Sequence, residues 1–146
     1  LIIGLEVKMI DDWSAIGYRH CDGGRKAAGF KMTKAYRSDC VVRSITIVSE
    51  KPYEEVFNEM MQLGIKMGGL PNIKPIYFKY LKNLGFEKMR CPRDENGKLI
   101  KLRDWFNAPE RAVVLNSRHL TAVVRNEVRD TWDCRYRPVN TYWVKE

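Results

Sequence analysis

Cys40 is the side chain best placed to act as a nucleophile. It stands where a polar stretch that suits a loop, ending at Asp39, gives way to an apolar run that suits a buried helix. A thiol in the first turn of a helix lies at the positive end of the helix dipole, which favours the thiolate form. The sequence therefore predicts a reactive cysteine at the start of a helix.

A histidine and two carboxylates follow in the second half of the chain, at His119, Asp130 and Asp133. Arg125 and Asn126 suit a two-residue hairpin turn, since Asn tolerates a positive φ. With that turn, His119 and Asp130 are diagonal neighbours on one face of the hairpin, and Asp133 points to the other face. A bulge or a longer turn would reverse the faces. Asp130 is therefore the predicted partner of His119, and Asp133 is the alternative.

These residue types form the triad that thiol nucleophiles use. His119 would take the proton of Cys40, and Asp130 would fix the tautomer of the imidazole and favour its charged form. Taken singly, a cysteine is more often a small buried hydrophobe and a histidine an ordinary polar group. Their order along the chain, Cys at a helix start, His on a strand and Asp on the partner strand, is more specific, and on these residues alone a catalytic role and a structural role are both open.

The short turn formed by Asp22, Gly23, Gly24 and Arg25 is a second candidate, as a substrate or loop site. The glycines allow a tight turn, and the guanidinium of Arg25 can bind a carboxylate or a substrate with two hydrogen bonds. The alternative is a structural turn in which Asp22 and Arg25 pair with each other. The turn is too short for a phosphate loop.

Helices in the first half and strands in the second must position these residues. Apolar periodicity predicts helices at 40–48, 52–63 and 73–84, and a helical turn at 102–106. It predicts strands at 86–89, 111–116, 119–124, 128–132 and 141–144, with a turn at 96–97. The result is one α+β domain, 1–146, with an N-terminal arm and loop at 1–39, a helical half at 40–84 and a mainly antiparallel sheet at 85–146.

Length and composition limit the class of protein. A chain of 146 residues with 45% hydrophobic content builds one compact core. The net charge of +8 comes from dispersed basic residues with no run of five or more, so nucleic-acid binding is not favoured. Since no stretch of about eighteen apolar residues occurs, neither a membrane span nor a signal peptide is predicted. A soluble cytoplasmic protein with free thiols is expected, and no oligomeric state is assigned.

The spacing of cysteines and histidines predicts no metal and no cofactor. Zinc sites bring ligands in close pairs such as Cys-x-x-Cys, and this chain has no such pair. The side chains that could supply zinc ligands are those of His20, Cys21, Cys91, His119 and Cys134.

Five segments of the chain, at 22–30, 39–43, 52–56, 117–123 and 130–134, share an order and spacing with a known family. They resemble a family of small phage and bacterial papain-like cysteine peptidases, and the resemblance covers 22–143. It implies a papain-like fold, related in plan to transglutaminase-like folds, in which the nucleophile helix packs on an antiparallel sheet. For a phage-encoded protein it also implies the cytoplasm of the bacterial host.

The same resemblance implies roles for individual residues. Cys40 corresponds to the nucleophile, His119 to the base, and Asp130 or Asp133 to the third member. One departure concerns the oxyanion: papain-type enzymes carry a Gln a few residues before the nucleophile, whereas this chain has Thr33 there, followed by Lys34. The backbone N–H of Cys40 can donate, and a second donor is not assigned.

The expected function is hydrolysis of an amide or isopeptide bond in a protein or peptide substrate. Acyl transfer of the transglutaminase type uses the same residues and stays open. The rival is a catalytically weak or inactive module that binds protein or nucleic acid. It draws on the net charge, on the basic tail at 135–145, and on aromatic side chains near Lys or Arg, which are Tyr77, Tyr80, Trp105, Tyr136, Tyr142 and Trp143.

Overall fold

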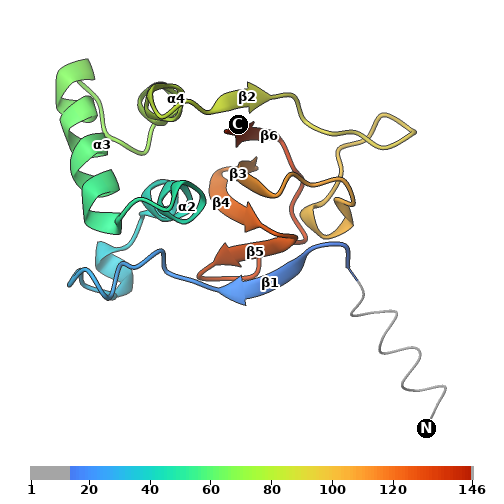
Figure 1. Ribbon diagram of the computed structural model, residues 1–146, viewed down its shortest axis with the longest axis horizontal. Helices are drawn as coiled ribbons and strands as arrows, with labels where there is room; N and C mark the ends of the chain where they lie inside the picture. Colours follow the sequence, from blue (N-terminus) through green and yellow to red (C-terminus); the bar gives the residue numbers. More distant parts are fainter. Residues whose placement is uncertain (1–13, 146) are drawn as a thin grey trace, which may run out of the picture.

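A computed structural model of the protein describes residues 14–145. Figure 1 shows the helices on one side of a six-stranded sheet and the connection from β2 to β3 on the other. The helices are α2 (Cys40–Ser49), α3 (Tyr53–Met67) and α4 (Lys74–Asn83), with short 3-10 helices η1 (Lys34–Tyr36) and η2 (Leu102–Asp104). The strands are β1 (Gly17–His20), β2 (Glu87–Met89), β3 (Arg111–Asn116), β4 (His119–Val124), β5 (Glu127–Asp130) and β6 (Thr141–Val144). The α+β class is as predicted.

The sheet is mixed, so the prediction of an antiparallel sheet was wrong in one respect. Its strand order is β1-β5-β4-β3-β6-β2, and β1 runs parallel to β5 while the other neighbours are antiparallel. The segment 1–39, interpreted from the sequence as a long arm or loop with room for one short strand or helix, contains the strand β1. β1 is an edge strand whose side chains are half-buried or exposed, so its sequence lacks the apolar alternation that marks a strand.

The end of β1 is held against the end of β5 by two hydrogen bonds to one carbonyl. The Tyr18 hydroxyl donates to the Asp130 carbonyl at 3.2 Å, and the Cys21 backbone N–H donates to the same oxygen at 2.9 Å. The N-terminal strand thus supports the residue that the sequence predicts as the third member of the triad.

Helix α2 begins at Cys40, as predicted, in spite of its β-branched residues. Val41, Ile45 and Val48 are buried in the core that α2 shares with the sheet. This burial outweighs the weak helix propensity of valine and isoleucine.

Helix α3 ends at Met67, one turn beyond the predicted end at 63. Gly64 lies inside the helix, and a Cβ on it would approach the Gly69 carbonyl oxygen to 2.6 Å. Glycine is therefore required here by the close approach of the following loop, and the actual stop is Gly68, at φ 78°.

The predicted hairpin between β4 and β5 is confirmed in its register. Arg125 and Asn126 have φ of 49° and 62°, and Val124 pairs with Glu127. Strand β5 ends at Asp130, earlier than the predicted 132. The cause is local, because the Thr131 N–H donates to the Asp130 side chain at 2.7 Å instead of continuing the ladder.

Two apolar clusters cover the two faces of the sheet. Helices α2, α3 and α4 cover one face, and the β2–β3 connection with the segment after β5 covers the other. Four of the aromatic side chains that supported a binding module are buried in these clusters, namely Tyr77, Tyr80, Trp105 and Trp143. No helix within 14–145 is long and apolar enough to cross a membrane.

Candidate functional site

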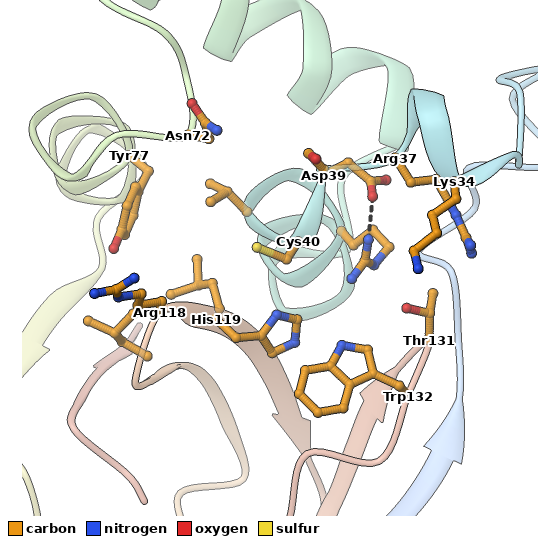
Figure 2. A pocket seen from close by; sticks show the side chains of 15 residues that line it. Lys34, Arg37, Asp39, Cys40, Asn72, Tyr77, Arg118, His119, Thr131 and Trp132 are labelled. Carbon is orange, nitrogen blue, oxygen red and sulfur yellow. Dashed lines mark hydrogen bonds and ion pairs between the residues drawn. The ribbon is translucent and has the colours of Figure 1, made fainter. Parts of the chain in front are cut away.

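Cys40 lies in a cleft of about 490 Å³ between the start of α2, helix α4 and the sheet. Cys40 is the first residue of α2, and Asp39 is the N-cap. The backbone N–H of Cys40 therefore has no intrahelical acceptor. Figure 2 shows the Cys40 side chain between Tyr77 and Trp132, with the His119 ring beside it. The half-buried thiol is therefore accessible from the cleft.

His119 and Asp130 form a short, buried hydrogen bond. His119 is the first residue of β4 and Asp130 the last residue of β5, and the distance from Nε2 to Oδ2 is 2.6 Å. The Thr121 hydroxyl donates to the same carboxylate oxygen, also at 2.6 Å. Because Nε2 is occupied by Asp130, Nδ1 is the ring nitrogen left to exchange a proton with Cys40.

The structure brings Asp130, and not Asp133, to His119. Asp133 forms a pair with Arg135 at 2.9 Å, and its side chain is 43% exposed. Asp130 is 2% exposed. Asp130 is the last residue of β5 beside β4, whereas Asp133 lies beyond the end of the strand.

The electrostatics of the cleft favour a thiolate beside an imidazolium. Burial alone would raise the pKa of Cys40, but hydrogen bonds from His119 and from the Leu120 backbone lower it below the usual value, helped by the charges of His119 and Arg43. Burial alone would lower the pKa of His119, but hydrogen bonds with Asp130, Cys134 and Cys40 raise it well above the usual value. Both shifts support the ion pair.

Arg43 is a residue of the site that the sequence reasoning missed. Its Nη2 lies 3.2 Å from Asp130 Oδ1, and its Nη1 forms an ion pair with Asp39. All three side chains are buried. Burial alone would raise the pKa of Asp130, but hydrogen bonds with His119 and Thr121 and the charges of His119 and Arg43 lower it, so Arg43 contributes to keeping this carboxylate ionised. The spacing of Asp39 and Arg43, four positions apart on a helix, is the signal that could have revealed it.

The turn at 22–25 supports the start of α2 and does not line the Cys40 cleft. Asp22 accepts hydrogen bonds from the backbone N–H groups of Gly24 and Lys26, at 2.8 and 3.0 Å. Arg25 is 4% exposed. Its side chain pairs with Asp39 at 3.2 Å, as one of the two sequence interpretations predicted.

The arrangement around Asp22 and Arg25 thus differs from the other interpretation, a local pair between their side chains. Gly23 has φ 70°, and a Cβ on it would lie 3.2 Å from the backbone of Arg43. Only glycine allows the turn to approach α2 so closely.

One group of side chains has donor atoms close enough to hold a metal ion. Ligand atoms of His119, Asp130 and Cys134 lie within 4.8 Å of one another. Both oxygens of Asp130 already accept hydrogen bonds, from His119 and Thr121 on one side and from Arg43 on the other. A cation there would lie beside the Arg43 guanidinium, which disfavours metal binding.

The rim of the cleft is positively charged. Lys34, Arg37 and Arg118 line it, and within the described part of the chain no acidic side chain forms an ion pair with any of them. The indole of Trp132 packs on the His119 ring, with 4.7 Å between ring centroids. The cleft thus combines an activated thiol with a cationic entrance.

No family model, no curated protein and no solved structure matches this chain.

Proposed function

We propose that the protein is a cysteine hydrolase that cleaves an amide or isopeptide bond in a protein or peptide, with Cys40, His119 and Asp130 as its triad. One observation carries the proposal. A thiol with a lowered pKa shares a cleft with an imidazole that is held by a buried carboxylate 2.6 Å away. Perturbed titratable groups that converge in a cleft are typical of catalytic sites.

The reaction has two steps. In the first, the Cys40 thiolate adds to the carbonyl carbon, His119 gives its proton to the leaving nitrogen, and the C–N bond breaks to leave a thioester on Cys40. In the second, His119 takes a proton from water, the hydroxyl oxygen adds to the thioester carbon, and the C–S bond breaks to restore the thiolate and release the acid. An amine in place of water would give acyl transfer with the same residues.

The oxyanion would be held by the free backbone N–H of Cys40 and by the hydroxyl of Tyr77. Tyr77 lines the cleft and is 4% exposed. Its hydroxyl has no hydrogen-bond partner among the described residues. Burial, with a contribution from the charge of Cys40, raises the pKa of Tyr77 to about 12. The hydroxyl therefore stays protonated and can donate to a developing negative charge.

Replacing Tyr77 with Phe should slow the acetylation of Cys40 by p-nitrophenyl acetate about tenfold, because one oxyanion donor is lost. Alkylation of Cys40 by iodoacetamide forms no oxyanion, so its rate should not change. Stopped-flow absorbance gives the first rate, and mass spectrometry of the labelled protein gives the second. Equal acetylation rates in Tyr77→Phe and the wild type would remove Tyr77 from the mechanism.

The proposed function is tested by trapping the acyl-enzyme. The folded protein, mixed with p-nitrophenyl acetate, should release a stoichiometric burst of p-nitrophenolate and carry an acetyl group on Cys40, located by peptide mass spectrometry. Cys91 is half-buried like Cys40 but does not line the cleft, so Cys91→Ala should keep the burst and Cys40→Ala should lose it. A screen of fluorogenic peptide amides then follows. A burst that survives in Cys40→Ala contradicts the proposal.

We propose a papain-like fold, supported by the order of a nucleophile at a helix start followed by His and Asp on neighbouring strands. We also propose that the protein acts in the cytoplasm of a bacterium, as a host protein or a phage product. The support is that all four cysteines are free, which suits a reducing compartment.

A second candidate function is a module that binds an anionic protein or nucleic acid without catalysis. The observation in its favour is the cationic rim formed by Lys34, Arg37 and Arg118. Salt-sensitive binding of an acidic peptide or an oligonucleotide by Cys40→Ala, combined with no acetylation of Cys40 in the wild type, would favour this module over the hydrolase.

A further inference from the structure

We propose that an apolar cavity beside the Cys40 cleft is a substrate subsite that binds a large apolar side chain on the acyl part of the substrate. The inference rests on the proposed function, since it assigns a substrate class to the same site. The cavity has a volume of about 580 Å³ and lies between the 25–42 segment, helix α3 and the loop before α4.

The cavity and the Cys40 cleft lie next to each other. Both are lined by Ser38, Asp39, Val41 and Asn72. Val41 follows Cys40 directly on α2, so its side chain lies at the boundary between the two spaces. A substrate bound at the thiol can therefore place a neighbouring group in the cavity without leaving the cleft.

The walls of the cavity are mainly aromatic and aliphatic. They include Phe30, Tyr36, Val42, Phe57, Met61 and Leu70. Three of these side chains are exposed in spite of their size: Tyr36 is 60% exposed, Met61 is 41% exposed and Leu70 is 68% exposed. An apolar group that covered them would gain about 25 cal/mol for each Å² removed from water.

The charged residues around the cavity do not oppose an apolar ligand. Arg25 and Asp39 pair with each other at 3.2 Å, and the Lys31 ammonium lies 4.7 Å from the Tyr36 ring centroid. No carboxylate lies free on this wall among the described lining residues. An uncharged, bulky side chain is the occupant that fits these walls.

The position of His119 assigns the cavity to the acyl part. His119 must reach the leaving nitrogen, so the leaving group lies on the side of the sheet. None of the residues that line the cavity comes from a strand, since all belong to the 25–42, 57–61 and 70–72 segments. The acyl part therefore extends away from His119, toward the cavity.

The experiment compares acylation of Cys40 by p-nitrophenyl esters of N-acetylglycine, N-acetylleucine and N-acetylphenylalanine, with p-nitrophenyl acetate as the reference. The leucine and phenylalanine esters should acylate Cys40 at least about tenfold faster than the glycine ester, as a side chain in an apolar pocket provides. Leu70→Asp places a charge on the wall and should remove this preference while the acetate rate stays unchanged. Ile65→Asp is the matched control, because Ile65 is 72% exposed on α3 and does not line the cavity.

The experiment distinguishes a wrong subsite from a wrong function. If acetate acylates Cys40 but the three amino-acid esters react equally, the subsite is wrong and the proposed hydrolase stands. If Cys40 is not acylated by any ester, the proposed function fails and the inference fails with it. If the wild type sediments as a dimer that Leu70→Asp converts to a monomer, a second copy covers the cavity and the subsite is overturned.

Discussion

Replacing His119 with Ala should slow the hydrolysis of an acetyl group on Cys40 by about 10²-fold, because the variant has no base to take the proton of the attacking water. The acetyl group is installed with p-nitrophenyl acetate, excess reagent is removed, and the loss of the acetyl mass is followed over time. The matched control is His20→Ala, since His20 is exposed on β1 and is the only other histidine. Equal deacylation in the two variants would exclude His119 as the base.

The same variant should change how the reactivity of Cys40 depends on pH. In the wild type the pKa of Cys40 is lowered, mainly by His119 against the opposing effect of burial, so the thiolate persists below the range in which an ordinary thiol, with a pKa of about 8.5, is protonated. At pH 6, iodoacetamide should therefore label Cys40 roughly tenfold faster than Cys91, a modest factor because a low-pKa thiolate is also a weaker nucleophile. In His119→Ala this advantage should vanish at pH 6, and by pH 9 both thiols should react alike.

A thermal unfolding scan decides whether a loss in His119→Ala reflects chemistry or unfolding. Asp130→Asn offers a second variant that keeps the size of the side chain. It removes the charge that holds His119 protonated, so the labelling profile of Cys40 should move toward higher pH. A profile that is unchanged in Asp130→Asn would mean that Asp130 only shapes the fold.

Replacing Arg43 with Met should lower the free energy of unfolding by about 3–5 kcal/mol, because it leaves two buried carboxylates, those of Asp39 and Asp130, without their shared cation. Met keeps most of the length and the apolar stem of the side chain, so the decrease in the free energy of unfolding measures the effect of removing the charge. Urea denaturation followed by circular dichroism measures it. Arg19→Met is the matched control: Arg19 is 63% exposed and pairs with Glu127 at 3.3 Å, and its loss should cost less than about 1 kcal/mol.

A loss in Arg43→Met that equals the loss in Arg19→Met would contradict the role of Arg43 as the central cation of a buried network. In Arg43→Met protein that stays folded, the labelling of Cys40 gives a second measurement. Because the charge of Arg43 contributes to the lowered pKa of Cys40, the labelling profile of Cys40 in Arg43→Met should move toward higher pH, in the same direction as in Asp130→Asn.

The sequence was sufficient to predict the helix that begins at Cys40 and the hairpin that carries His119 and Asp130. Both depend on local signals, namely the change from polar to apolar residues at Cys40 and the tolerance of Asn126 for positive φ. Register then follows by counting, because side chains alternate faces along a strand. That rule favours Asp130 over Asp133 as the partner of His119, and Asp133 stays the alternative for a bulged or longer turn.

The residues that the sequence reasoning missed depend on tertiary contacts. Arg43 interrupts an apolar helix and looks like an exposed position, until the two carboxylates that it bridges are brought together. Strand β1 lies at the sheet edge with half-buried or exposed side chains, so no apolar alternation marks it in the sequence. Gly64 resembles a helix end, and only the approach of the following loop explains why it lies inside α3.

The attachment of Asp130 to β1 has a consequence for the order of folding. Tyr18 contacts Asp130, which lies 112 positions further along the chain. The loop that this contact closes therefore spans most of the domain. Closing a loop of that length is slow and comes late in folding. A nascent chain or a proteolytic fragment that contains α2 but not β4 and β5 lacks His119 and Asp130, so its Cys40 is an ordinary thiol. Under the proposed function, Cys40 thus becomes a reactive thiolate only once β4 and β5 have folded against α2.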